Sequence, residues 1–178
     1  MSRILARDRA ALVVIDVQEA FREPVDSFDE VAAGTATLIQ GARTLGLPVV
    51  VTEQYPRGLG ATVPEVAAHL EGVVPIEKVV FSACRADGFD LGGRDQALVC
   101  GIETHVCVNQ TVHDLLDRGV EVHVAADAVS SRTPANRELG LHKMEESGAI
   151  LSSVETALFE LVGRAGTDEF KKVQRLVL

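Results

Sequence analysis

Residues 96–107 read QALVCGIETHVC, and this stretch decides the fold because it predicts a strand that runs directly into a helix. The first five residues form a largely apolar run that is typical of a buried strand, and Gly101 ends it. A helix is expected from Thr104 to Arg118, which places Cys107 in its first turn. Unpaired backbone N–H groups and the positive end of the helix dipole gather at such a turn and can stabilise a thiolate.

Four more short apolar runs occur at residues 11–15, 49–51, 120–125 and 149–151. They lack polar alternation, which is typical of strands buried on both faces of a parallel sheet. Helical patterns lie between and after the runs, at residues 31–45, 66–70, 134–147, 157–161 and 170–178. The chain is therefore predicted to be α/β: a single domain over residues 1–178, built as a Rossmann-type three-layer α/β/α sandwich with a mainly parallel sheet of five to six strands.

Local signals indicate where several helices begin and end. Thr62 and Ser152 each stand three residues before a glutamate, and this capping-box spacing predicts the starts of the helices at 66–70 and 157–161. Gly46 predicts the end of the helix at 31–45. The last helix is expected to pack on a neighbouring subunit.

Composition limits the partners of the chain. Its 17 basic and 26 acidic residues give a net charge of −9, which disfavours nucleic acid because like charges repel. The three cysteines are odd in number and lack C-x-x-C spacing, which predicts a reducing, cytoplasmic location and no disulfide framework. The first nine residues are too charged for a signal peptide, and no apolar run reaches spanning length, so no membrane association is expected.

Two residues with suitable chemistry follow predicted strands. Asp16 ends the run at 11–15 and Cys107 follows the run at 96–100, so both side chains reach one crevice if these strands are neighbours. A partly desolvated Asp16 could accept a thiol proton, although an Asp at such a position, taken alone, more often caps the next turn. Lys78 lies in an apolar segment and either snorkels at the surface or points its ammonium into the site.

Burial is the alternative explanation for each cysteine, because free cysteine is among the most buried residue types. Cys100 lies inside a predicted strand and fits this explanation well, whereas the pattern around Cys84 favours neither explanation. Only Cys107 has the placement at a helix start that favours reactivity.

Three spaced motifs resemble those of the isochorismatase-like cysteine hydrolases. They are Asp16-Val-Gln18 after the first strand, Lys78 in a central segment, and Gly101-Ile-Glu-Thr-His-Val-Cys107. The similarity covers nearly the whole chain, and segments 52–56 and 126–132 look most like the isochorismatase domain-containing proteins. The resemblance implies the isochorismatase-like fold and assembly into a homo-oligomer.

The same resemblance implies a catalytic triad. Cys107 would be the nucleophile, Asp16 its general base, and Lys78 the cation that lowers the pKa of the thiol and orients both groups. It also implies a cis peptide bond between Ile102 and Glu103. The backbone N–H groups of Glu103 and Cys107 would then form an oxyanion hole.

The nicotinamidase branch of this family binds a metal through a D-x-H element and further histidines after the second strand. Here that place reads TEQYPR (residues 52–57), without histidine, and the five histidines of the chain lack ligand spacing. We therefore expect no catalytic metal and no other cofactor. The side chains expected to line a pocket for a small-molecule substrate are Gln18, Phe21, Tyr55 and Phe81, and Gln18 could also hold a neighbouring loop by hydrogen bonds.

Three functions are compatible with these features. The first is a metal-independent cysteine hydrolase that cleaves a small amide or related C–N bond through a thioester, and the complete triad favours it. The second is isochorismatase-type hydrolysis of a vinyl ether, which protonation by Asp16 could drive without the cysteine. The third is a non-catalytic domain for oligomerisation or partner binding, and the complete triad disfavours it.

Overall fold

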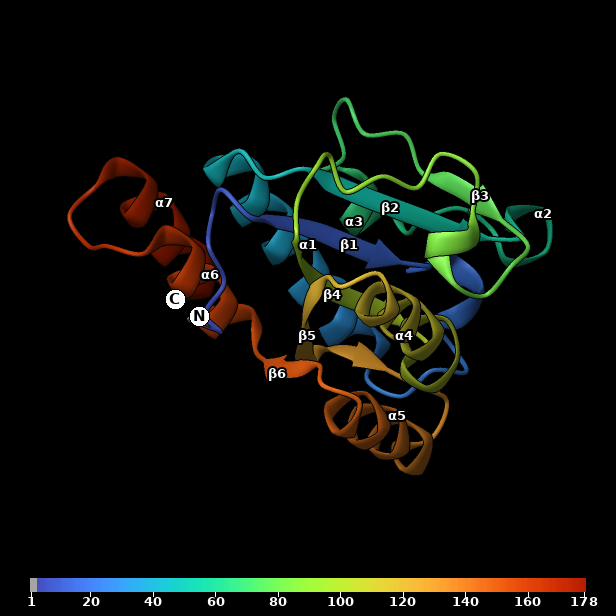
Figure 1. The fold of residues 1–178 in the computed structure, drawn as a ribbon. Coiled ribbons are helices and arrows are strands. Elements are labelled where there is room, and N and C mark those ends of the chain that lie inside the picture. Colours follow the sequence, from blue (N-terminus) through green and yellow to red (C-terminus); the bar gives the residue numbers. More distant parts are fainter. Residues whose placement is uncertain (1–2) are drawn as a thin grey trace.

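The computed structural model describes residues 3–178 and contains a six-stranded sheet with helices on both faces (Figure 1). All neighbouring strands are parallel, in the order β3-β2-β1-β4-β5-β6, which confirms the predicted three-layer α/β/α architecture. The strands are β1 (Ala10–Ile15), β2 (Val49–Gln54), β3 (Ile76–Lys78), β4 (Gln96–Ile102), β5 (Glu121–Ser130) and β6 (Ile150–Ser152). The helices are α1 (Phe28–Leu45), α2 (Pro56–Leu59), α3 (Pro64–Ala67), α4 (Asn109–Asp117), α5 (Pro134–Glu146), α6 (Val154–Val162) and α7 (Asp168–Val177).

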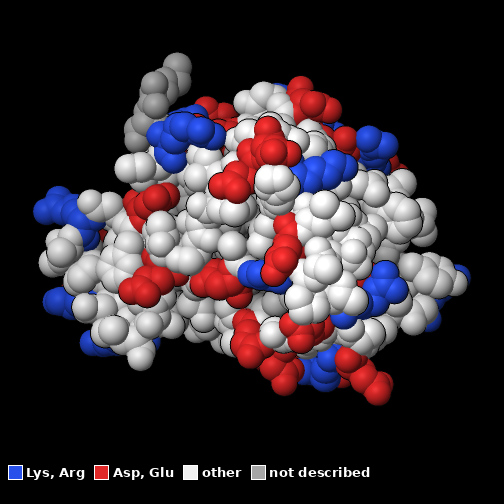
Figure 2. All heavy atoms as spheres, turned by 90° about the horizontal axis from the view of Figure 1, so that it is seen from below, with Lys and Arg blue, Asp and Glu red and all other residues white. Residues whose placement is uncertain are grey.

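The surface carries mixed charge. On the face drawn in Figure 2, Lys and Arg side chains are scattered among Asp and Glu side chains. Within residues 3–178, no helix is long and apolar enough to cross a membrane.

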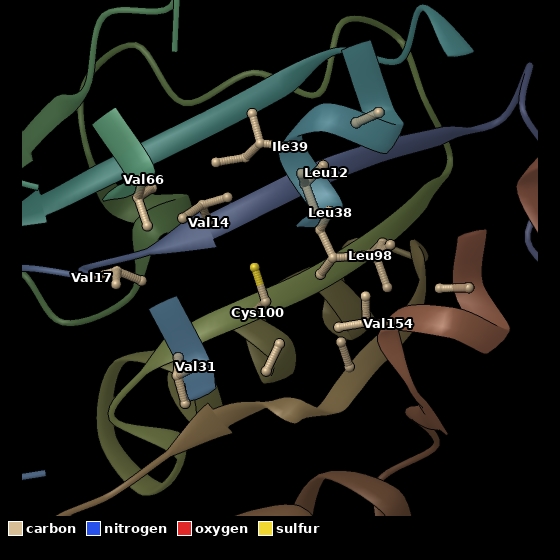
Figure 3. Packing of buried hydrophobic residues seen from close by; sticks show 14 of the residues in the cluster. Leu12, Val14, Val17, Val31, Leu38, Ile39, Val66, Leu98, Cys100 and Val154 are labelled. Carbon is tan, nitrogen blue, oxygen red and sulfur yellow. The ribbon is translucent and has the colours of Figure 1, made fainter. Parts of the chain in front are cut away.

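The core is divided between the two faces of the sheet, because successive side chains of a strand point to opposite faces. On one face Val14 and Cys100 belong to the cluster that includes residues of α1, α6 and α7 (Figure 3). On the other face Val13 and Val99 belong to the cluster that includes residues of α4 and α5. Both faces are thus covered, and this explains why the strands show no polar alternation.

Strand β3 was not predicted, and β5 is longer than its apolar run suggested. Strand β3 lies at the edge of the sheet and has only three residues, and two of them, Glu77 and Lys78, are charged, so it shows no apolar run. Strand β5 continues past Ala125 to Ser130, and its register against β4 shifts between Val99 and Gly101.

Both capping-box predictions are wrong in detail. The helix expected at 66–70 is the single turn α3, whose N-cap is Val63 without a side-chain bond. The hydroxyl of Thr62 instead donates to the Glu53 carboxylate, at 2.7 Å. Helix α6 is capped by Ser153, one residue later than expected, because its hydroxyl accepts the Thr156 N–H. Gly46 ends α1 as predicted, with φ of 74°.

The helix that carries Cys107 is not α-helical at its start. Residues Thr104–Val108 form a π-helical turn, and α4 begins at Asn109. π-Turns inside helices occur frequently at functional sites. The peptide bond between Ile102 and Glu103 is cis, as the family resemblance implies.

The last helix packs within its own chain. Val173 of α7 is fully buried in the cluster shared with α1 and α6, and the rings of Phe170 and Phe159 are 6.1 Å apart, edge to face. These contacts account for the apolar face of α7. Packing on a neighbouring subunit, which the sequence led us to expect, is therefore not needed to explain it.

Candidate functional site

The site lies where the order of strands along the sheet changes direction, between β1 and β4. Ligands of doubly wound sheets bind at this point, outside the carboxyl ends of the strands. Strand β1 ends directly before Asp16, and β4 leads into the turn with Cys107. Gly101 makes this junction possible, since its φ is +118° and a Cβ there would lie 2.0 Å from the carbonyl oxygen of Ile15.

Asp16 is fully buried at the end of β1. Its backbone φ is +52°, in the left-handed region that only a small share of non-glycine residues adopt. One carboxylate oxygen accepts the Thr52 hydroxyl at 2.7 Å and the other accepts the Lys78 ammonium at 2.7 Å. Burial raises the pKa of Asp16 above its usual value, while Lys78 and then Thr52 act in the opposite direction. The side chain faces these partners and does not cap the next turn.

Lys78 ends the edge strand β3, and its side chain is completely excluded from solvent. The snorkelling alternative is therefore wrong. Its ammonium donates to Asp16 and to the side-chain oxygen of Gln54 at 2.6 Å. It also contacts the carbonyl oxygens of Phe81 at 3.0 Å and Val80 at 3.3 Å. The ammonium of Lys78, which belongs to β3, is thus fixed against the Asp16 carboxylate at the end of β1, two strands away.

Cys107 lies in the π-helical turn, and only 6% of its surface is exposed. Its thiol is close enough to Asp16 and Lys78 for both to influence its pKa. Burial, followed by the negative charge of Asp16, raises the pKa of the Cys107 thiol to about 12, against an opposing effect of Lys78. Lys78 lowers the pKa of the thiol, as the resemblance implies, but loss of contact with water has the larger effect in the resting site.

Gln18 holds the loop that follows β2. Its side-chain amide donates to the carbonyl oxygens of Gln54 at 2.9 Å and Gly60 at 2.7 Å, and its oxygen accepts the Gln54 N–H at 2.7 Å. This confirms that Gln18 holds a neighbouring loop by hydrogen bonds. Gln18 is fully buried, so it holds the loop from the inside of the protein and has no exposed surface in a pocket.

The three aromatic candidates lie in different environments. Tyr55 and Phe81 are half exposed, at 53% and 51%, whereas Phe21 packs partly buried against the core. A cavity of about 390 Å³ opens beside Lys78 and is lined by Tyr55, Pro56, Arg57, Glu77, Lys78 and Val79. The exposed aromatic rings are therefore available to a ligand, and that of Phe21 is available only in part.

Residues after β5 hold the turn that contains Cys107. The Glu103 carboxylate accepts the backbone N–H of Arg132 at 3.1 Å and its guanidinium at 3.0 Å. Two residues further along the chain, the Nδ1 atom of His105 and the Ser131 hydroxyl are 3.0 Å apart. The motif at 126–132 thus meets the motif at 101–107 in space.

The family follows from comparison with known proteins. The model of the isochorismatase domain matches residues 10–156, which is most of the chain. The chain belongs to the isochorismatase family.

Close relatives of this family member cover almost all of it. Isochorismatase domain-containing protein 2 of Macaca fascicularis is 44% identical over 169 residues, covering 93% of this chain and 82% of the relative. A structure described as MAR1 ribonuclease from Caenorhabditis elegans is 42% identical with a TM-score of 0.94, covering 98% of this chain and 92% of that one. YcaC from Pseudomonas aeruginosa, with hexane-2,5-diol and covalent acrylamide, is 25% identical with a TM-score of 0.89, covering 100% and 93%.

The isochorismatase-family site contains two polar residues to which the sequence analysis gave no role. Thr52 binds Asp16 and Gln54 binds Lys78, from alternate positions at the end of β2. Alternate residues of a strand share one face, and this period was the signal that could have identified them.

The structure describes no ligand set for a metal at this site. Among residues 3–178, no group of three or more His, Cys, Asp or Glu side chains is arranged to hold an ion. The charge that faces Asp16 is the ammonium of Lys78.

Proposed function

We propose that this isochorismatase-family protein is a metal-independent cysteine hydrolase that cleaves a small amide or related C–N bond. The observation that carries the proposal is the fully buried Asp16–Lys78 pair beside the Cys107 thiol. Burying two charges is costly, and a fold with no use for them is often no less stable with apolar residues in their place. A buried carboxylate with a raised pKa is suited to accept and return a proton.

In the first step the Cys107 sulfur attacks the amide carbonyl, and the thiol proton passes to Asp16. A carbon–sulfur bond forms, and the carbonyl oxygen becomes an oxyanion. The high pKa of the thiol, about 12, favours transfer during the attack over a thiolate that exists beforehand. Lys78 offsets the negative charge of Asp16 before the transfer.

In the second step the oxyanion collapses, the C–N bond breaks, and Asp16 returns the proton to the leaving nitrogen. The products are ammonia or an amine and a thioester on Cys107. Water then attacks the thioester while Asp16 accepts its proton. Collapse of the second oxyanion releases the acid, and the sulfur recovers its proton from Asp16.

The backbone N–H groups of Glu103 and Cys107 are the proposed oxyanion hole. Donors fixed in advance stabilise an oxyanion more than a neutral carbonyl, and this difference accelerates the reaction. The contacts of the Glu103 carboxylate with Arg132 hold the segment that supplies one of these donors.

Two half-exposed aromatic side chains are available to contact a small amide. Tyr55 and Phe81 are the side chains proposed to contact the substrate, with Phe21 and Gln18 supporting the adjacent loop. Acrylamide, which is covalently present in YcaC from Pseudomonas aeruginosa, is itself a small amide and an electrophile for thiols. A thiol adds to its carbon–carbon double bond and leaves the C–N bond intact, so its presence in that relative supports a nucleophilic site rather than a particular substrate class.

The experiment that tests this proposal is a screen for ammonia release over small amides and ureides. Wild-type protein should release ammonia from at least one compound, and Cys107→Ala should abolish that release. Zinc in stoichiometric amount, together with loss of activity on chelation, would contradict the metal-independent mechanism. No turnover over the whole panel, together with an unreactive Cys107, would favour a binding domain.

Hydrolysis of a vinyl ether is the second candidate, and the raised pKa of Asp16 favours it. A buried carboxyl that holds a proton can protonate the double bond, and water can attack the resulting cation without help from a thiol. Turnover of a vinyl ether that is insensitive to Cys107→Ala would replace the amide proposal.

We propose a small-molecule substrate in place of nucleic acid, although the relative from Caenorhabditis elegans is described as a ribonuclease. The net charge of −9 and the scattered basic residues in Figure 2 support this choice. Cleavage of RNA that is lost with Cys107→Ala would contradict it.

Assembly into a homo-oligomer and a cytoplasmic location, both inferred from the sequence, remain predictions for light scattering and cell fractionation.

A further inference from the structure

The ammonium of Lys78 has no unused donor. It carries three N–H groups, and four oxygens lie within 3.3 Å: those of Asp16, Gln54, Phe81 and Val80. The shortest of these contacts is that with the side chain of Gln54, at 2.6 Å. The ammonium is therefore a fixed cation, and its position depends on what holds it opposite Asp16.

The side chain of Gln54 is held so that its oxygen faces Lys78. Its NH₂ group donates to the Val79 carbonyl at 3.1 Å, which leaves the oxygen for the ammonium. Its backbone N–H and carbonyl are both bound by Gln18. Gln54 and Lys78 are also direct partners in the register of β2 and β3. A flipped amide would place NH₂ against the ammonium, so the contacts define one orientation.

We propose that Gln54 is a positioning residue, whose side-chain oxygen holds the Lys78 ammonium against Asp16 while Cys107 reacts. This inference rests on the proposed cysteine hydrolase and assigns a role to a residue that does not belong to the triad. The physical reason is that the interaction between two charges weakens as the distance between them grows. Lys78 lowers the pKa of both Asp16 and Cys107, and both effects weaken as the ammonium moves away.

Other charged side chains near this pair are engaged elsewhere or exposed. The Glu53 carboxylate is turned to Thr62, whose backbone N–H and hydroxyl it accepts at 2.7 Å. Glu77 and Arg57 are exposed at the rim of the cavity beside Lys78. Asp16 is the carboxylate in contact with the ammonium, so displacement of Lys78 should act first on Asp16.

The test compares Gln54→Leu and Gln54→Glu with a matched control, Gln96→Leu. Gln96 is a fully buried glutamine at the opposite end of the sheet, where it binds Ala6, Ile4 and Glu121. The first readout is the rate at which iodoacetamide labels Cys107 between pH 5 and 9, measured on the Cys107 peptide. The second is kcat and KM for the best amide from the screen.

Gln54→Leu should lower kcat by about 10-fold to 100-fold with little change in KM, the size expected for loss of a hydrogen bond to a buried charge. Its labelling profile should move to higher pH, because Asp16 loses the close cation that lowers its pKa. Gln54→Glu keeps an oxygen opposite Lys78. It should recover most of kcat at pH values above the shifted acid limb of its pH profile. Gln96→Leu should change neither the profile nor kcat.

A change in KM alone in Gln54→Leu would mean that Gln54 contacts substrate, and the proposal would be wrong. An unshifted profile, or an equal shift in Gln96→Leu, would also overturn it. The proposed function is tested separately by Cys107→Ala. If that variant retains turnover, the hydrolase proposal fails even where the Gln54 variants shift the labelling profile of Cys107.

Discussion

Cys84 and Cys107 are two thiols in nearly the same packing environment, and they differ in the carboxylate beside them. Each is 6% exposed, and both belong to the same hydrophobic cluster. Thr111 connects them, because its carbonyl accepts the Cys84 thiol at 3.7 Å and its hydroxyl donates to the Cys107 carbonyl at 2.7 Å. Burial raises the pKa of Cys84 to about 11 and that of Cys107 to about 12. Acidity of the resting thiol therefore does not favour Cys107.

The two carboxylates have opposite pKa shifts. Asp114, near Cys84, accepts two hydrogen bonds from the guanidinium of Arg85, at 2.7 and 2.9 Å, and this hydrogen-bonded pair holds the pKa of Asp114 below its usual value. Asp16, near Cys107, is buried, and its pKa is raised. A carboxylate with a raised pKa is the better proton acceptor. We therefore expect Cys107 to be the reactive thiol, because Asp16 beside it is the better base.

The largest expected effect separates the two cysteines directly. Cys107→Ala should lower amide turnover on the order of 10⁴-fold, because the covalent step is lost. Cys84→Ala should leave kcat within about twofold, since the thiol it removes takes no part in the reaction. Steady-state kinetics on both variants measures this difference, and equal losses would mean that neither cysteine is the nucleophile.

The next effect separates the two carboxylates. Asp16→Asn should lower kcat about 10²-fold to 10⁴-fold, because the amide cannot accept and return a proton. Asp114→Asn keeps the fold of the site and should leave kcat nearly unchanged. In wild-type protein kcat/KM should fall at low pH as Asp16 becomes protonated, with a midpoint above the usual aspartate pKa because its pKa is raised. A midpoint at or below that usual value would contradict the role of burial.

A third prediction concerns the junction that separates Cys100 from Cys107. Gly101→Ala introduces a Cβ that would lie 2.0 Å from the Ile15 carbonyl oxygen, in addition to the strain at φ of +118°. Gly148 has φ of +109° but no atom within 4 Å of such a Cβ, so Gly148→Ala isolates the strain alone. Gly101→Ala should lower the free energy of unfolding by at least about 2 kcal/mol more than Gly148→Ala. Equal losses in urea unfolding would show that the close approach is relieved easily.

The smallest predicted effect compares two buried threonines. Thr52→Val removes the hydroxyl that binds Asp16 and should move the acid limb of kcat/KM upward by about one pH unit or less, because this bond lowers the pKa of Asp16. Thr35→Val removes the hydroxyl that contacts Cys100 at 3.8 Å on the other face of the sheet. That control should leave the acid limb in place. A shift of the limb to lower pH in Thr52→Val would contradict the assigned contact.

Much of the fold could be predicted because burial dominates its strands. The apolar runs of β1 and β4 and the glycine between Cys100 and Ile102 predicted a parallel sheet and a strand–helix junction correctly. Burial inside a predicted strand also distinguished Cys100 from Cys107. The sulfur of Cys100 lies among Leu98, Val14 and Leu38 in Figure 3. Strand β3 could not be predicted, because two of its three residues, Glu77 and Lys78, are charged and interrupt any apolar run.

The sequence predicted which residues form the site better than it predicted their burial and their pKa values. The position of Asp16 after a strand located the carboxylate, but a short apolar segment could not show whether Lys78 was exposed. Gln54 and Thr52 act through contacts across strands, which depend on sheet order and register. The high pKa of Cys107 follows from how closely the fold covers the thiol, and no local pattern reports this.

The most direct test of base-assisted attack is the pH dependence of iodoacetamide labelling, measured separately on the Cys107 and Cys84 peptides of the native protein. Cys84 should react in proportion to its thiolate, about tenfold faster per pH unit between pH 7 and 9. Cys107 should react faster than Cys84 at pH 7, and its rate should level off above the pKa of Asp16, because the ionised carboxylate then accepts the thiol proton. Parallel slopes and equal rates at pH 7 would contradict the central claim.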